Sequence, residues 1–321
     1  MFRFTRSFIL ASALALGLPA AFAGPLVEPA ELAAKLSSPA LRVLDIRDGK
    51  NEAGKTPYEL GHLPGSLPAP YSQWRGPKDN PGALPEAARL TQLLQRLGLD
   101  ADTEVVVVHE GKDATDFGAA ARVYYTLKVA GLSKLSILNG GVKAWQAAGQ
   151  PLRTDAAPAV KSSTYVARID DRLVATREEV ELAVKNKAGV LIDARPAAFF
   201  QGETRHVAAK VPGTIDGARN VSHAIWFENN RSTLPSADEV RRIAQQHGLV
   251  APTDGSQTVS FCNTGHWAST NWFVLSEVLG QPNVAMYPDS MVDWSGAGLP
   301  MSNVPSRLKQ LLIDAKLNIG S

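Results

Sequence analysis

The feature that most constrains this chain of 321 residues is an internal repeat that spans nearly all of it. The segment Leu44-Asp45-Ile46-Arg47 returns as Ile192-Asp193-Ala194-Arg195, and Trp145 has a counterpart in Trp294. The two aspartates are 148 residues apart and the two tryptophans 149. Near-constant spacing between such distant landmarks indicates a duplicated domain, so the fold must be one that two similar halves can each adopt.

Each half alternates short apolar strands with amphipathic helices. In the first half we expect strands at 41–45, 104–109 and 135–138, and helices at 29–36, 87–97 and 117–130. The second half repeats this order, with helix-capping residues at Thr176 and Ser236. Four consecutive valines at 105–108 are typical of a parallel strand covered on both faces. The predicted fold class is therefore α/β, with each half an open, mainly parallel sheet flanked by helices.

The start of the chain has the pattern of a secretory signal peptide. Arg3 and Arg6 are basic, residues 8–18 are almost entirely apolar, and Ala21-Phe22-Ala23 offers a small-x-small cleavage site. We expect cleavage after Ala23 and a periplasmic or secreted protein. The alternative, an uncleaved anchor, is less favoured because no stretch approaches the roughly 18 uninterrupted apolar residues that a membrane span needs.

The mature chain is electrically balanced. Two of the 33 Lys and Arg residues lie in the leader, which holds no acid, so 31 basic residues face 31 acidic ones. This balance excludes general nucleic-acid binding, and after signal cleavage no membrane binding is expected. The aperiodic segment 153–164 indicates a linker. We expect an N-terminal domain at 24–152, a C-terminal domain at 165–303 and a tail at 304–321.

Cys262 is the only cysteine, so no internal disulfide is possible. The β-prone segment 258–261 leads into it, and an apolar series at mostly helical spacing follows from Trp267. The thiol is therefore predicted at a strand-to-helix turn, at the strand end where open α/β sheets place their sites. A lone cysteine can also be a small buried hydrophobe, but the polar loop that follows favours a chemical role.

The run Asn263-Thr264-Gly265-His266-Trp267 is expected to surround that thiol. The first N–H groups of a helix have no internal partners, and together with the helix dipole they stabilise a thiolate, a persulfide or an oxyanion. Gly265 permits a positive φ. His266 either holds a positive charge near the thiolate or faces solvent. Trp267 either lines the pocket mouth or anchors the helix.

Together these motifs resemble the rhodanese family in its tandem, two-domain sulfurtransferase form, over about residues 27–303. The run Gly61-His62-Leu63-Pro64-Gly65-Ser66 adds to the two Asp-x-Arg segments, the Cys262 loop and the two Trp segments. The resemblance implies two rhodanese-like domains, of which the second is catalytic. Aligning the two strands places Glu110 where the thiol would be, so the first domain is interpreted as a non-catalytic wall of the site.

The resemblance implies transfer of a sulfane sulfur. Cys262 attacks a small anionic donor such as thiosulfate, sulfite leaves, and the persulfide passes its sulfur to cyanide, a thiol or a protein acceptor. No cofactor is implied, and the scattered histidines lack metal-ligand spacing. The Arg usual in the family after the second Asp-x-Arg segment is absent, so Arg195, Arg205 or Lys210 could supply the charge. Arg195 is the candidate for binding substrate.

Two other functions remain open. A phosphatase or arsenate reductase of similar fold needs an Arg six positions after the cysteine, and Ala268 stands there. A non-enzymatic persulfide carrier or interaction module would use the same loop.

Overall fold

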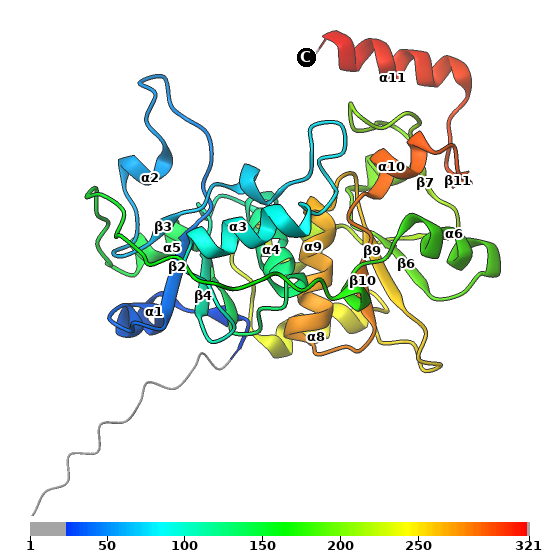
Figure 1. The fold of residues 1–321 in the computed structure, drawn as a ribbon. Helices are drawn as coiled ribbons and strands as arrows, with labels where there is room; N and C mark the ends of the chain where they lie inside the picture. The colour runs from blue at the N-terminus through cyan, green and yellow to red at the C-terminus, as the bar shows by residue number, and fades with distance from the viewer. Residues whose placement is uncertain (1–23, 320–321) are drawn as a thin grey trace, which may run out of the picture.

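The computed structural model describes residues 24–319, so the expected signal peptide at 1–23 and the last two residues of the tail lie outside the described part. The described chain forms two α/β domains, which lie side by side in Figure 1. This is the predicted fold class, and the core of each domain sits on both faces of its sheet.

The first domain contains a fully parallel five-stranded sheet in the order β1-β5-β4-β2-β3. Its strands are β1 (Leu26–Val27), β2 (Leu41–Asp45), β3 (Leu67–Pro68), β4 (Glu104–Val108) and β5 (Leu135–Leu138). Its α-helices are α1 (Pro29–Lys35), α2 (Pro57–Leu60), α3 (Ala87–Arg96), α4 (Ala114–Val129) and α5 (Gly141–Ala147). Helix α4 begins three residues before the prediction because the Asp113 side chain caps it.

The second domain repeats this arrangement in the parallel order β10-β9-β6-β8. Its sheet strands are β6 (Val190–Asp193), β8 (Arg219–Asn220), β9 (Thr258–Phe261) and β10 (Val284–Met286). Strands β7 (Thr214–Ile215) and β11 (Met301–Ser302) form a separate antiparallel pair. Its helices are α6 (Arg177–Asn186), α7 (Ala197–Phe200), α8 (Ala237–Gln246), α9 (His266–Trp272), α10 (Ser290–Gly296) and α11 (Arg307–Ile319). The predicted capping box at Thr176 is present.

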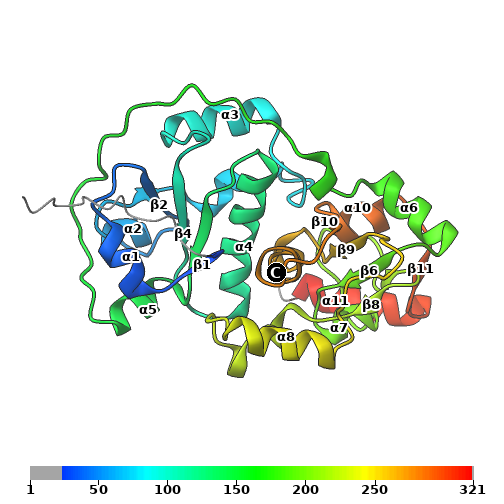
Figure 2. The ribbon, with the colours of Figure 1, turned by 90° about the horizontal axis from the view of Figure 1, so that it is seen from below.

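Short 3-10 turns occur at Tyr71–Trp74, Asp171–Leu173, His223–Trp226 and Glu228–Asn230, and α9 continues as a π-helical turn, Phe273–Val278. Residues 154–170, which include most of the expected linker, contain neither helix nor strand. In Figure 2 this segment passes α3 on its way to α6. There Ser163 donates its backbone N–H to the Gln95 carbonyl at 3.1 Å.

The two domains share one apolar core, because α4 and α9 pack against each other between the sheets (Figures 1 and 2). Tyr124 and Phe117 of α4 contact Phe273 with ring centroids 4.9 and 5.7 Å apart, and Tyr125 contacts Trp272 at 4.8 Å. A helix that is buried almost all round belongs to the interior of a protein rather than to its surface. The first domain is therefore part of the structure that supports α9 and the loop before it.

Among the described helices, none has the length and apolar character that crossing a membrane requires.

Candidate active site

Cys262 lies directly after β9 and before α9, at the strand-to-helix turn that the sequence predicts. Its carbonyl accepts the Met291 N–H at 3.1 Å, and its own N–H donates to Ser290 Oγ at 3.0 Å. The residue is only 1% exposed. The thiol therefore occupies a fixed position beneath the surface, at the carboxyl edge of the sheet.

Gly265 shapes the loop that follows, which we call the cysteine loop (residues 262–267). Its φ of +66° is the left-handed conformation that the sequence predicts for it. A Cβ here would lie 2.3 Å from Nη1 of Arg122 and 2.6 Å from the Pro288 carbonyl oxygen. Both the backbone conformation and the close approach of neighbours require glycine.

Several backbone donors of the cysteine loop are unused. Within residues 24–319, the N–H groups of Asn263, Thr264, His266 and Trp267 have no hydrogen-bond acceptor. They follow the thiol directly and include the first turn of α9, where orphan donors and the helix dipole favour negative charge. This arrangement suits a thiolate, a persulfide or a small oxyanion.

Ser290 braces the cysteine loop from the other side. It is fully buried, and its Oγ accepts the N–H groups of Cys262 at 3.0 Å and Gly265 at 3.2 Å. Its φ of +55° is strained for a residue other than glycine, and such strain concentrates at functional sites. Sequence reasoning missed Ser290. The available signal was that the other copy of the domain has Gly141 at this position.

Arg195 is mainly structural. It forms a two-pronged ion pair with Asp193, donates to the Gly213 carbonyl at 2.7 Å, and reaches the cysteine loop only through Asn263 Oδ1 at 3.4 Å. Arg205 bonds Asp314 of α11 and carbonyls of its own loop, and Lys210 is held through its backbone N–H by Ser295. The side-chain bonds of Arg195 and Arg205 are thus mainly to structural partners, and of these two it is Arg195 that touches the cysteine loop.

Positive charge instead reaches the cysteine loop from the first domain. Arg75 donates Nη2 to the Thr264 carbonyl at 2.9 Å. Arg122, fully buried on α4, donates Nη1 to the Gly265 carbonyl at 3.4 Å and Nη2 to the Gly82 carbonyl at 2.8 Å. Burial and then the neighbouring Arg75 charge lower the pKa of Arg122 to about 10. Sequence reasoning missed both residues because no local motif marks them.

His266 connects the domains rather than carrying charge. Its Nε2 lies 2.8 Å from the Thr115 carbonyl oxygen, which only accepts, so Nε2 carries the hydrogen. Nδ1 then accepts from the Tyr71 hydroxyl at 2.7 Å. Burial, followed by the charge of Arg75, lowers the pKa of His266 to about 4. His266 is thus neutral at pH 7, which corrects both the expected cationic role and the solvent-facing alternative.

Trp267 belongs to an aromatic group with Phe199 and His223. Its indole stacks on the His223 ring at 4.9 Å and meets Phe199 edge-on at 5.7 Å, while Nε1 donates to Thr115 Oγ1 at 3.2 Å. Burial lowers the pKa of His223 to about 4, so this ring is also neutral at pH 7. These contacts anchor Trp267 to both domains while leaving it partly exposed.

The first-domain counterpart of Cys262 is His109, not Glu110. Strand pairing sets Asp45 opposite Val108 in the first domain and Asp193 opposite Phe261 in the second. The residue after Val108 is His109, and the residue after Phe261 is Cys262, so these two are equivalent. The sequence alignment was wrong by one residue because the first-domain loop is one residue longer before its helix begins. The first-domain loop therefore presents an imidazole where the second presents a thiol.

The corresponding first-domain loop is already occupied by an internal carboxylate. Asp116 accepts the N–H groups of Gly111 at 2.6 Å and Lys112 at 2.9 Å, and His109 Nδ1 lies 2.9 Å from the same oxygen. Burial raises the pKa of Asp116, but the bonds from His109 and the amides outweigh it and lower the pKa to about 2. Counting from the helix caps, the equivalent residue in the second domain is Ala268, so no such carboxylate fills the cysteine loop.

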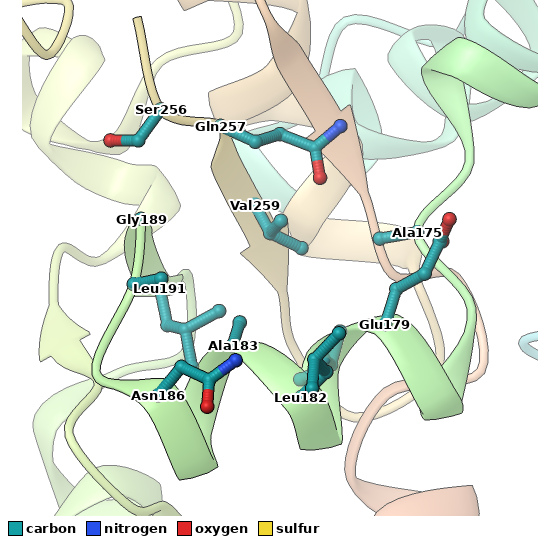
Figure 3. Close-up of a pocket in the computed structure, with 12 residues that line it drawn as sticks. Ala175, Glu179, Leu182, Ala183, Asn186, Gly189, Leu191, Ser256, Gln257 and Val259 are labelled. Atoms are coloured by element: carbon teal, nitrogen blue, oxygen red, sulfur yellow. The ribbon is translucent and has the colours of Figure 1, made fainter. Parts of the chain in front are cut away.

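A cavity of about 250 Å³ lies elsewhere in the second domain, and Figure 3 shows the residues that line it. It lies between α6 and the amino-terminal ends of β6 and β9, where Gly189 and Gln257 contribute to its wall. Cys262 follows the opposite, carboxyl end of β9. This cavity is therefore separate from the cysteine loop.

Across residues 24–319, no three or more His, Cys, Asp and Glu side chains gather as a metal-ligand set.

Comparison with known proteins agrees with this architecture. The family described as "Rhodanese-like domain" matches residues 28–148 and 176–297. A Synechococcus elongatus protein provisionally named a thiosulfate sulfurtransferase is 28% identical over 88% of this chain and 86% of its own. The sulfur carrier protein TtuD of Thermus thermophilus is 29% identical over 83% of this chain and 92% of its own.

Solved structures show the same fold. The 3-mercaptopyruvate sulfurtransferase-type protein SseA of Escherichia coli superposes with a TM-score of 0.70 at 25% identity, over 83% of this chain and 98% of its own. An anaerobic ergothioneine biosynthesis enzyme of Chlorobium limicola gives 0.75 at 20% identity, over 88% of this chain and 71% of its own. With two matched domains that cover most of its length, the chain belongs to the rhodanese family, as a tandem sulfurtransferase-type member.

Proposed function

We propose that this protein is a sulfurtransferase that carries sulfane sulfur as a persulfide on Cys262. The observation that supports this most directly is the contrast between the two copies of one loop. In the first domain the loop amides hold the Asp116 carboxylate, while in the second they follow a thiol, and those of Asn263, Thr264, His266 and Trp267 have no acceptor within the described residues. A loop that stabilises a carboxylate in one copy suits an anionic sulfur in the other.

The proposed reaction has two steps. The Cys262 thiolate attacks the outer sulfur of thiosulfate, a new S–S bond forms, and the old S–S bond breaks with its electron pair leaving on sulfite. A thiol, as thiolate, or cyanide then attacks the outer persulfide sulfur and restores the Cys262 thiolate. Dividing the transfer in this way is what a nucleophilic cysteine achieves, and no external oxidant or cofactor is needed.

The charges around the loop favour an anionic donor. Arg75 and Arg122 hold carbonyls of the cysteine loop, whereas His266 and His223 are neutral at pH 7. Two classes of donor are suggested by the names of relatives, thiosulfate in one and 3-mercaptopyruvate in another. Because Cys262 is 1% exposed, either donor must react with a buried sulfur.

A persulfide carrier is the second candidate, favoured by the likeness to the sulfur carrier protein TtuD at 29% identity. In that case Cys262 loads in the same way but discharges to one protein partner rather than to small thiols. A phosphatase or arsenate reductase is less well supported, because Ala268 leaves the loop without its own guanidinium.

Intact-mass measurement after mixing with thiosulfate or 3-mercaptopyruvate tests the proposal. We expect the wild type to gain one sulfur atom and Cys262→Ser to gain none while keeping its circular dichroism spectrum. Discharge by cyanide and small thiols on the turnover timescale supports the enzyme, and loading without such discharge supports the carrier. Hydrolysis of p-nitrophenyl phosphate without sulfur loading would refute both.

A further inference from the structure

The geometry points to a second role for the first domain. We infer that Arg75, assisted by Arg122, is a positioning residue that holds the cysteine loop in its anion-stabilising form. This deepens the proposed function, because it concerns how the same site is prepared for sulfur chemistry. It also makes a claim about the thiol that can be tested without any sulfur donor.

Arg75 follows the 3-10 turn Tyr71–Trp74 of the first domain and reaches across the domain interface. Its guanidinium donates Nη2 to the Thr264 carbonyl at 2.9 Å and Nη1 to the Tyr71 hydroxyl at 3.1 Å. Tyr71 in turn bonds His266 at 2.7 Å. One first-domain side chain therefore holds the cysteine loop at Thr264 directly and at His266 through Tyr71.

Arg122 adds a second point of attachment from inside the interface. It is fully buried, and its guanidinium is fixed by the Gly82 and Ala83 carbonyls at 2.8 and 3.1 Å. A second nitrogen of the same guanidinium, Nη1, donates to the Gly265 carbonyl at 3.4 Å. Two consecutive carbonyls of the cysteine loop are thus turned toward arginines of the first domain.

Peptide geometry converts these two contacts into an orientation of the donors. In a planar trans peptide, the C=O and the following N–H point in opposite directions. Because Arg75 draws the Thr264 carbonyl toward the first domain, the Gly265 N–H must point away from it, and it does bond Ser290 Oγ at 3.2 Å. By the same geometry Arg122 turns the His266 N–H away from the first domain.

The arginines also act by charge. The Arg122 and Cys262 side chains are near enough for a thiolate to raise the pKa of Arg122, although burial and Arg75 dominate and lower it. The positive charge of Arg75 also acts on other groups of the second domain. After burial, it is the largest cause that lowers the pKa of His206 and of His266. A cation near a thiolate stabilises it, and hydrogen bonds from a guanidinium polarise the peptides that they hold.

The test measures alkylation of Cys262 by iodoacetamide, a neutral reagent, as a function of pH. For Arg75→Met we expect the alkylation rate at pH 7 to fall about tenfold. Arg75→Lys keeps the charge but loses the two-pronged geometry, so it should recover part of the rate. Arg153→Met is the matched control, because Arg153, at the start of the linker, has an exposed side chain that forms an ion pair with Asp155.

Thermal melting and sulfur loading on the same four proteins separate the possible outcomes. A lower melting temperature for Arg75→Met with an unchanged alkylation rate would make Arg75 merely structural and overturn the inference. An equal fall in rate for Arg153→Met would assign the effect to net charge and also overturn it. If Arg75→Met does not fold, Arg75→Lys alone decides through its alkylation rate. Wild type that alkylates but never loads sulfur would instead refute the proposed function.

Discussion

Replacing Gly265 by alanine separates the conformation of the cysteine loop from its packing. Gly265 has φ +66°, and an added Cβ would stand 2.3 Å from Arg122 Nη1 and 2.6 Å from the Pro288 carbonyl oxygen. Gly298, also in the second domain, has φ +69° with nothing within 4 Å of its Cβ position. The two glycines therefore share one backbone conformation, and only Gly265 is crowded.

The expected costs follow from this comparison. A left-handed backbone costs an L-residue about 1–2 kcal/mol, and this is all that Gly298→Ala should lose. At Gly265 the methyl also forces Arg122 or the Pro288 peptide aside, which adds roughly 1–3 kcal/mol by analogy with overpacked cores. Gly265→Ala should thus destabilise the protein by about 2–5 kcal/mol. It should also slow sulfur loading, because the displaced groups hold the cysteine loop.

Equilibrium unfolding in urea, followed by tryptophan fluorescence, gives the two stability changes. Sulfur loading by intact mass gives the second readout, with Gly298→Ala expected to load at the wild-type rate. Equal destabilisation by both alanines, together with an unchanged loading rate for Gly265→Ala, would refute the reasoning that the loop is tightly enclosed by Arg122 and Pro288.

Three further predictions concern single side chains. Protonation of His266 in the unfolded state should lower the protein's free energy of unfolding by about 2 kcal/mol between pH 7 and 5, because the folded pKa of about 4 lies below the unfolded pKa of 6.5. In this pH range the unfolded state binds a proton that the folded imidazole does not bind. His266→Gln should therefore flatten the pH dependence of the urea midpoint, and an unchanged slope would contradict this. Asp116→Asn should destabilise by about 2 kcal/mol at pH 7, an effect that vanishes as pH falls from about 4 toward 2, with normal sulfur loading. Ser290→Ala removes the acceptor of two loop N–H groups, so loading kinetics should slow about tenfold, and wild-type kinetics would exclude this role.

The sequence predicted the architecture well because that information is local and periodic. Apolar strands such as β2 and β4 and the capping box at Thr176 each depend on residues within a few positions, and the near-constant spacing revealed the duplication. Errors arose where a single side chain decides a boundary. The Asp113 cap started α4 three residues early, and one extra loop residue shifted the Glu110 alignment.

The candidate site divides in the same way. Cys262 at a strand end and Gly265 at a positive φ could be predicted, because strand pattern and backbone conformation are properties of neighbouring residues. The partners of His266, Tyr71 and Thr115, could not, because they lie about 150 to 195 residues away in sequence. A polar loop histidine that looked available for charge proved to be neutral.

By itself, then, the sequence determined two α/β domains and one thiol at the start of a helix. Only the tertiary structure decided which groups surround that thiol. Packing of α4 against α9 places Arg122 on the cysteine loop, and the 3-10 turn Tyr71–Trp74 brings Arg75 to it. The hydrogen-bond register of the first sheet places His109 in the equivalent position. The physical reason is that charge and hydrogen bonding depend on distance in space, which chain spacing alone does not fix.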